Sequence, residues 1–161
     1  LAGNPGSSIA HSNLGSILLD QQHNVQEAEW HFREAIRIRP DYAFGQYNYG
    51  NAVSAQGRYL EAMDHYRQAI RLMPDHANSH YNLANMLMNF GRLAEAEPEL
   101  REAIRLQPDH CDAYNNLGVL LLKRNDLKGA VESFQGALRV CPGYRLAGET
   151  LARLRAEGKI K

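Results

Sequence analysis

Four stretches of the sequence share one form: EAIRIRPDY (residues 34–42), QAIRLMPDH (68–76), EAIRLQPDH (102–110) and GALRVCPGY (136–144). In each stretch, apolar residues recur at helical spacing before a proline, which ends the helix. The four prolines lie 34 residues apart: Pro40, Pro74, Pro108 and Pro142. A fixed period of this length is typical of chains built from stacked structural repeats. We therefore expect a helical repeat protein.

A second apolar run lies upstream in each repeat: HSNLGSILL (11–19), QYNYGNAVS (46–54), HYNLANMLM (80–88) and AYNNLGVLL (113–121). Its apolar residues have the spacing of an amphipathic helix. The short segments between the two runs contain residue types that tolerate a tight turn, namely Asn24, Gly57, Gly91 and Asn125. The first of these segments is one residue longer than the others. Each repeat is therefore predicted to be a helical hairpin.

Small residues recur where the two helices of a hairpin would cross. Gly or Ala occupies positions 15, 50, 84 and 118, and Ala occupies 28, 62, 96 and 130. Small residues let two helices approach, and larger ones fill the gaps between them: Phe32, Tyr66, Leu100 and Phe134. In the fourth repeat the full pattern reads Tyr114, Leu117, Gly118, Leu121, Ala130, Phe134, Ala137 and Pro142.

This pattern resembles the tetratricopeptide-repeat family over nearly the whole chain. The resemblance implies an all-α fold, a right-handed α-solenoid of four helical hairpins with a C-terminal capping helix. Pro98 falls early in the second helix of the third repeat, where we expect a local distortion at most.

The register of the repeats predicts the boundaries. Residues 1–7 align with the end of a preceding repeat, or form a linker, because Pro5 stands where Pro40 stands. The repeats are predicted at 8–42, 43–76, 77–110 and 111–144, the capping helix at 145–157 and a tail at 158–161. In the capping helix, Leu146, Thr150, Leu151 and Leu154 would share the buried face. We expect the native array to continue upstream.

The composition excludes several classes of partner. Lys and Arg number 18 and Asp and Glu 18, so a salt-driven attraction to nucleic acid or to acidic membranes is not expected. No apolar stretch has the length of a membrane span. The two cysteines, Cys111 and Cys141, are too few for a disulfide scaffold. Free thiols and a cytoplasmic location are the expectation.

One asparagine occupies the same position in all four first helices, two residues before the small residue: Asn13, Asn48, Asn82 and Asn116. We call this set the asparagine ladder. In proteins that resemble this one, the first helices line the concave face. A carboxamide both donates and accepts hydrogen bonds, which suits the backbone of an extended peptide. Packed helices lie about 8–10 Å apart and a peptide advances about 3.3 Å per residue, so each asparagine would serve about every third peptide residue.

The predicted lining of this surface is nearly uncharged and contains aromatic rings. Besides the ladder, the site residues are Tyr47, Asn51, Tyr81, Asn85, Asn89 and Asn115. An alternative remains open, in which the asparagines bond to neighbouring repeats or to water. The ladder and the stretch AHSNLGSIL (10–18) are similar to the tetratricopeptide superhelix of O-linked N-acetylglucosamine transferases, in which such asparagines hold substrate polypeptides. The catalytic half of that family has no counterpart in this sequence.

Two other signals are interpreted as structural. The recurring outward arginines have acidic neighbours suited to surface ion pairs. The set His76, His80, His110 and Cys111 lacks four converging ligands, so no metal is predicted. No catalytic motif occurs, so no enzyme and no cofactor is predicted. Trp30, at a repeat position that faces solvent, could mark a second interface.

The sequence thus predicts a non-catalytic scaffold that binds an extended polypeptide through the asparagine ladder, with no nucleic-acid or membrane partner. Lys and Arg residues of chaperone-binding tetratricopeptide clamps are replaced here by Ser12, Asn78 and Asn82, so binding of a terminal carboxylate is not expected. Two alternatives are the substrate-recruiting arm of a larger glycosyltransferase and a structural module that forms homo-oligomers through its open N-terminal end.

Overall fold

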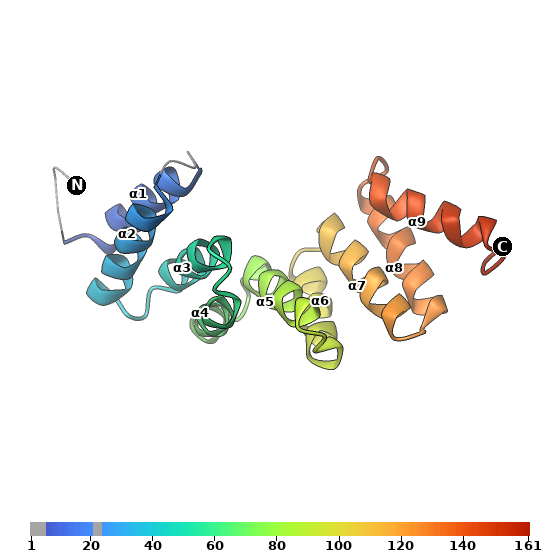
Figure 1. Ribbon diagram of the computed structural model, residues 1–161, viewed down its shortest axis with the longest axis horizontal. Helices are drawn as coiled ribbons and strands as arrows, with labels where there is room; N and C mark the ends of the chain where they lie inside the picture. Colours follow the sequence, from blue (N-terminus) through green and yellow to red (C-terminus); the bar gives the residue numbers. More distant parts are fainter. Residues whose placement is uncertain (1–5, 21–23) are drawn as a thin grey trace. The chain divides into compact units, whose positions relative to one another are not determined.

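The computed structural model describes residues 6–20 and 24–161, and within these ranges the regular structure is entirely α-helical (Figure 1). The helices are α1 (Ser8–Asp20), α2 (Val25–Ile38), α3 (Ala43–Ala55), α4 (Tyr59–Leu72), α5 (Ala77–Asn89), α6 (Leu93–Leu106), α7 (Cys111–Lys123), α8 (Leu127–Val140) and α9 (Arg145–Ala156). The pairs α1–α2, α3–α4, α5–α6 and α7–α8 are the four predicted hairpins. The prediction of an all-α helical repeat fold is confirmed.

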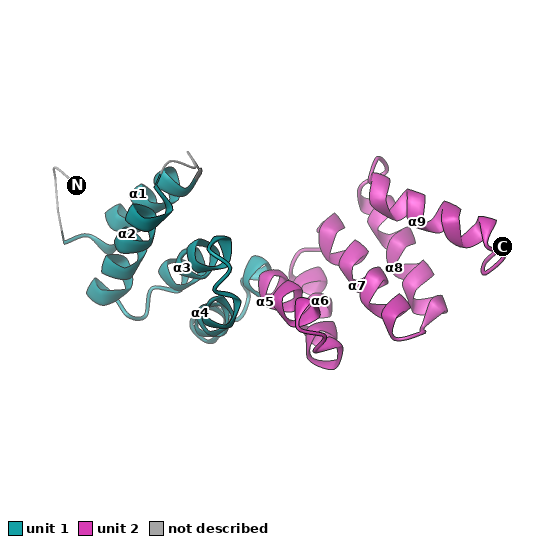
Figure 2. Ribbon diagram, in the orientation of Figure 1, with its two compact units in different colours: residues 1–79 teal, residues 80–161 magenta. Residues whose placement is uncertain are grey.

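The chain forms two compact units, residues 1–79 and residues 80–161 (Figure 2). The boundary falls in the first turn of α5. In unit 1, α3 packs against both α2 and α1. In unit 2, α7 packs against α6 and α8, and α9 packs against α8. Each unit therefore holds complete hairpins with their own buried core, while the handedness of the predicted solenoid stays a prediction.

Each hairpin is closed by a small residue of the first helix lying against a large residue of the second. A Cβ atom added at Gly50 would come within 2.8 Å of the Tyr66 ring, and one at Gly118 within 2.7 Å of the Phe134 ring. In the third repeat the pair is Ala84 and Leu100, both fully buried. The crossing of the helices therefore leaves room for one large side chain, which is an aromatic ring opposite glycine and the smaller leucine opposite alanine.

The turns between the helices follow the prediction in three repeats of four. Gly57 and Gly91 have φ of 77° and 71°, and Asn125 has φ of 62°, all in the left-handed region that glycine and asparagine tolerate. Asn24 differs, with φ of −158°. Its side chain instead accepts a hydrogen bond from the Glu27 N–H, so Asn24 is the N-cap of α2.

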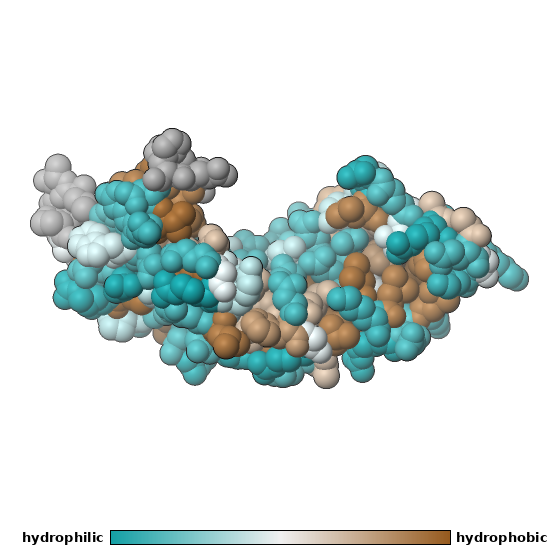
Figure 3. Space-filling view, viewed as in Figure 1, coloured by the Kyte–Doolittle hydropathy of each residue, from teal (hydrophilic) through white to brown (hydrophobic). Residues whose placement is uncertain are grey.

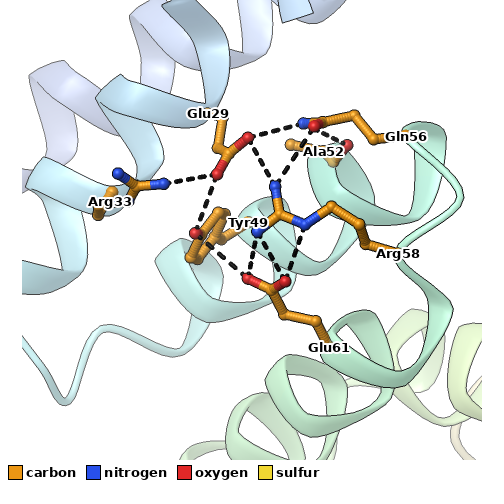
Figure 4. Close-up of polar contacts among 7 residues, drawn as sticks. All are labelled: Glu29, Arg33, Tyr49, Ala52, Gln56, Arg58 and Glu61. Carbon is orange, nitrogen blue, oxygen red and sulfur yellow. Dashed lines mark hydrogen bonds and ion pairs between the residues drawn. The ribbon is translucent and has the colours of Figure 1, made fainter. Parts of the chain in front are cut away.

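A hydrogen-bonded network of charged and polar groups links the first two repeats (Figure 4). The Glu29 carboxylate of α2, 8% exposed, accepts hydrogen bonds from Arg58 at 2.9 Å and Gln56 at 2.8 Å, both of the second repeat. Tyr49 and Arg33 donate to the other carboxylate oxygen. Burial alone would raise the pKa of Glu29, but the hydrogen bonds from Gln56 and Arg58 outweigh this effect and lower the pKa to about 2.

We expect Glu29→Gln to lower the free energy of unfolding by about 2 kcal/mol at pH 7, measured by urea denaturation. The pKa of Glu29 is lower in the folded than in the unfolded chain, so the stabilisation is present above about pH 4.5 and is lost as the pH falls towards 2. The two proteins should therefore converge in acid. Glu34→Gln is the control, because the Glu34 carboxylate accepts hydrogen bonds from Arg37 of its own helix in an exposed pair and does not link two repeats in the described structure. Equal stability of parent and Glu29→Gln at pH 7 would contradict this account.

A second kind of polar contact lies inside the hairpins, at one equivalent position in three repeats. The Nδ1 atoms of His11 and His31 are 2.9 Å apart, and His65 Nδ1 lies 2.8 Å from the Gln46 Oε1. In the third repeat, His80 Nδ1 lies 2.6 Å from a Glu99 carboxylate oxygen. Burial and the nearby His11 lower the pKa of His31, and burial lowers the pKa of His65. The folded protein thus favours neutral rings at His31 and His65.

The folded protein is accordingly expected to become less stable as the pH is lowered. Below about pH 6.5 the unfolded chain binds protons at His31 and His65 that the folded chain does not, so the free energy of unfolding should decline between about pH 7 and pH 5. Thermal denaturation followed by circular dichroism would show this decline. The double variant His31→Gln and His65→Gln should show a flatter profile, and a parent melting temperature constant over that range would exclude the effect.

Helix α6 continues through Pro98, which is consistent with the expectation of a local distortion at most. The structure differs from the sequence predictions at two further points. Cys111 and Cys141 form a disulfide with Cα atoms 6.1 Å apart, so the prediction of free thiols is wrong and no longer supports a cytoplasmic location. In α9 the buried residues are Ala147, Leu151 and Leu154, whereas Leu146 is 51% exposed.

Candidate protein-binding surface

The first-helix face of unit 1 is formed by α1 and α3, which carry the first two members of the asparagine ladder. The Asn48 Nδ2 donates to the Ser12 Oγ at 3.0 Å and to the Ser16 Oγ at 3.4 Å. Asn48 is half-buried, whereas Asn13 is exposed. The Asn48 amino group therefore links the first helices of two neighbouring repeats.

The first-helix face of unit 2, on α5 and α7, repeats this arrangement. The Asn116 Nδ2 donates to the Asn85 Oδ1 at 2.8 Å and to the Tyr81 hydroxyl at 3.4 Å. Asn85 and Tyr81 occupy the repeat positions that Ser16 and Ser12 occupy in the first repeat. Asn115 is 7% exposed and donates to the Asn116 Oδ1 at 3.3 Å. Little of Asn115 is left for a ligand, and it acts as a support for Asn116.

These contacts give the asparagines a structural role, which the sequence left open as an alternative. They also orient the amides. The Asn48 Nδ2 points to the serines of the preceding repeat, and its Oδ1 has no hydrogen-bond partner among the residues that the structure describes. Asn82, at the same repeat position, is half-buried and takes part in further interactions. At Asn48 the arrangement offers a partner an acceptor, not a donor.

Aromatic rings flank the ladder in both units. The Tyr47 and Phe44 ring centroids lie 4.7 and 5.3 Å from that of His76, both in edge-on geometry, and Phe44 is 47% exposed. In unit 2, the Tyr81 ring lies 4.5 Å from His110. Burial lowers the pKa of His110 and raises that of Tyr81, so both groups stay neutral near pH 7. The rings thus add apolar surface without charge.

The remaining predicted residues take different places. Asn51 accepts a hydrogen bond from the Tyr66 hydroxyl at 2.9 Å, which ties it to the hairpin core. Asn89 is exposed at the end of α5. Sequence reasoning missed His76 and His110 as parts of this surface. Their signal was present, because both stand two residues after the proline that ends a repeat.

Trp30 is 51% exposed, as its repeat position predicts, and its ring lies 5.6 and 4.8 Å from those of His11 and His31. The outward arginines form the expected surface ion pairs, for example Arg37 with Glu34 at 2.9 Å. Among residues 6–20 and 24–161, no group of three or more His, Cys, Asp or Glu side chains is placed to hold a metal ion. None of the helices described has the length and apolar character needed to cross a membrane.

Three family models, each described as a tetratricopeptide repeat, match residues 6–75, 53–118 and 111–141. Together they span residues 6–141, most of the chain. The chain belongs to the tetratricopeptide-repeat family. Such proteins are scaffolds for protein–protein interaction and are generally non-catalytic. No curated protein sequence gives a significant match to this tetratricopeptide-repeat chain.

Solved structures show the same fold. MamA from Desulfovibrio magneticus RS-1, residues 41 to the end, has a TM-score of 0.83 at 20% identity over 94% of this chain and 85% of that one. PilF of Pseudomonas aeruginosa has a TM-score of 0.85 at 25% identity over 94% of this chain and 69% of that one. YrrB, described as a tetratricopeptide-repeat protein with an unusual peptide-binding site, has a TM-score of 0.52 at 19% identity over 94% and 95%.

Proposed function

We propose that this tetratricopeptide-repeat protein binds an extended, uncharged segment of a partner protein along its first-helix faces. The observation that carries the proposal is the orientation of Asn48, whose amino group is held by Ser12 and Ser16 while its carbonyl oxygen has no described partner. A fixed acceptor on a half-buried helix face is suited to the N–H groups of a peptide backbone.

The surroundings of the asparagines support a neutral ligand. The rings of Tyr47, Phe44 and Tyr81 offer apolar contact, and the rings of two histidines pack against them. YrrB, a structural relative, is described as having a peptide-binding site. Modest affinity is expected, because a flexible peptide loses conformational entropy when it is ordered. Recruitment of substrates to a glycosyltransferase, which the likeness of the ladder suggested, remains a narrower hypothesis within this proposal.

The test compares two ladder variants. Asn13 is exposed and has no side-chain hydrogen bond among the described residues, so Asn13→Ala should weaken peptide binding several-fold and leave stability unchanged. Asn48→Ala should weaken binding and also lower the free energy of unfolding by about 1 kcal/mol, because it removes the contact with the serines of the first repeat. Binding would be measured by fluorescence anisotropy on peptides selected from an array of uncharged sequences.

Gln135→Ala is the control, since Gln135 is an exposed amide on the second helix α8. It should bind as the parent does. If Asn48→Ala loses stability while both ladder variants bind like the parent, the asparagines are structural and the peptide-binding proposal is wrong. The same conclusion follows if no array peptide binds the parent.

A second candidate function, self-association through α1, rests on a separate comparison. In the second repeat, Gly45, Tyr49 and Ala52 are buried, with Gly45 and Tyr49 against α2. The same positions are buried in α7 and in α9. In α1 they are Ala10, Leu14 and Ile17, of which Ile17 is 51% exposed. In the described part of the chain this apolar face of α1 is uncovered, which marks it for a second copy.

If two copies pair through α1, the protein should elute as a dimer at micromolar concentration in size exclusion with light scattering. Ile17→Glu would place a charge in the apolar contact and should give a monomer. Leu146→Glu is the matched control, because Leu146 is equally exposed, on α9. A monomeric parent at high concentration would exclude this function without affecting peptide binding.

A further inference from the structure

Helix α8 departs from the other second helices at three equivalent positions. Where α2, α4 and α6 have Glu27, Glu61 and Glu95, α8 has Gly129. At the second position α8 has Ser133, and the other second helices have His31, His65 and Glu99. At the third position α8 has Gly136, and the others have Glu34, Gln68 and Glu102. Three large polar side chains are thus replaced by Gly, Ser and Gly. Glycine within a helix is destabilising relative to other residues, so helix formation does not explain the change.

A hollow lies in unit 2 between α6, α7 and α8, beside Ser133. The space at Gly129 and Gly136 is taken by Asp126 and Tyr114, so Ser133 is the small residue that leaves room in the hollow. The pocket has a volume of about 350 Å³, with Gly129 and Ser133 on one wall and Ile104, Leu117 and Leu121 among its apolar residues. The Tyr114 ring, which also lines it, lies where a Cβ atom at Gly136 would stand. Figure 3, which draws one face of the molecule, shows apolar surface over α7 and α8. The volume lies at the lower end of the range of ligand sites.

The charged residues of the pocket are two arginines and one carboxylate. Arg101 and Arg105 of α6 and Glu132 of α8 line it. Arg101 pairs with Glu97 at 2.8 Å and Arg105 with Glu102 at 2.6 Å, both in exposed pairs on α6. Exposed pairs of this kind contribute little and exchange partners readily. A guanidinium also has donors to spare for a second carboxylate.

We propose that this pocket binds a large apolar side chain of a partner protein that has an acidic residue next to it. The apolar side chain would lie against Tyr114 and Leu121, in the space that Ser133 leaves open. The neighbouring carboxylate would bind Arg105 and Arg101. This site is on the side of the second helix α8, so it is separate from the peptide-binding proposal for the first-helix faces.

The experiment is a titration followed by proton–nitrogen NMR, with the acetylated peptide amide Gly-Asp-Phe-Gly as the probe. Two control peptides change one feature each: Gly-Lys-Phe-Gly reverses the charge and Gly-Asp-Ala-Gly removes the ring. The probe should shift the backbone amides of Gly129, Ser133 and Leu121, and the controls should bind at least about fivefold more weakly. The pocket proposal is overturned if none of these amides shifts, or if all three peptides shift them equally.

Protein variants then locate the binding. Ser133→His introduces the ring that His31 and His65 carry at the same repeat position, so it should fill the pocket and abolish binding in a folded protein. Ser133→Glu, the third-repeat residue, is the second filling variant should the histidine disturb folding. Arg105→Gln should reduce the preference for the acidic peptide. Gln135→Ala and Asn116→Ala should bind the probe like the parent, and undiminished binding by a folded filling variant would refute the site.

Discussion

The fold depends on one steric constraint, the close crossing of two helices at a small residue. Gly50 fits under the Tyr66 ring and Gly118 under the Phe134 ring, with no room for a methyl group. Where the small residue is Ala84, the partner is the smaller Leu100. This small-against-large pairing recurs in all four repeats, so it sets how closely the two helices of each hairpin approach.

The asparagines show how one side chain can hold two repeats together and leave a polar atom for another contact. Asn48 and Asn116 each use the amino group of the side chain to hold the preceding repeat. A carboxamide has two ends, and at Asn48 this contact uses only the amino group, so the carbonyl oxygen can act as an acceptor, whereas the Asn116 Oδ1 accepts from Asn115. On the peptide-binding proposal, removal of Asn48 would change both stability and binding, so the exposed Asn13 is the more informative position for binding.

Periodicity let the sequence predict the four hairpins, the tight turns at Gly57 and Gly91, and the exposure of Trp30. It could not predict features that depend on distances between repeats or on a single side-chain torsion. The disulfide needs Cys111 and Cys141 to come within reach, and only the structure gives their Cα distance of 6.1 Å. The burial of Asn115, beside the half-buried Asn116, likewise could not be read from the repeat pattern.

Residues that differ between equivalent positions of the repeats show what is particular to this chain, because the residues that all repeats share are explained by the common fold. Glu29 links the first repeat to the second through Arg58, and Glu97, at the same position, links the third repeat to the fourth through Arg124. The second repeat departs from this, because it has the apolar core residue Met63 there. Gly129 replaces a glutamate present in the other three second helices. A glutamate at the Glu29 position strengthens the link between two repeats, whereas the room at Gly129 is taken by the Asp126 side chain, which caps α8. Gly136 likewise makes room for the Tyr114 ring, so Ser133 is the changed position of α8 that accounts for the open pocket.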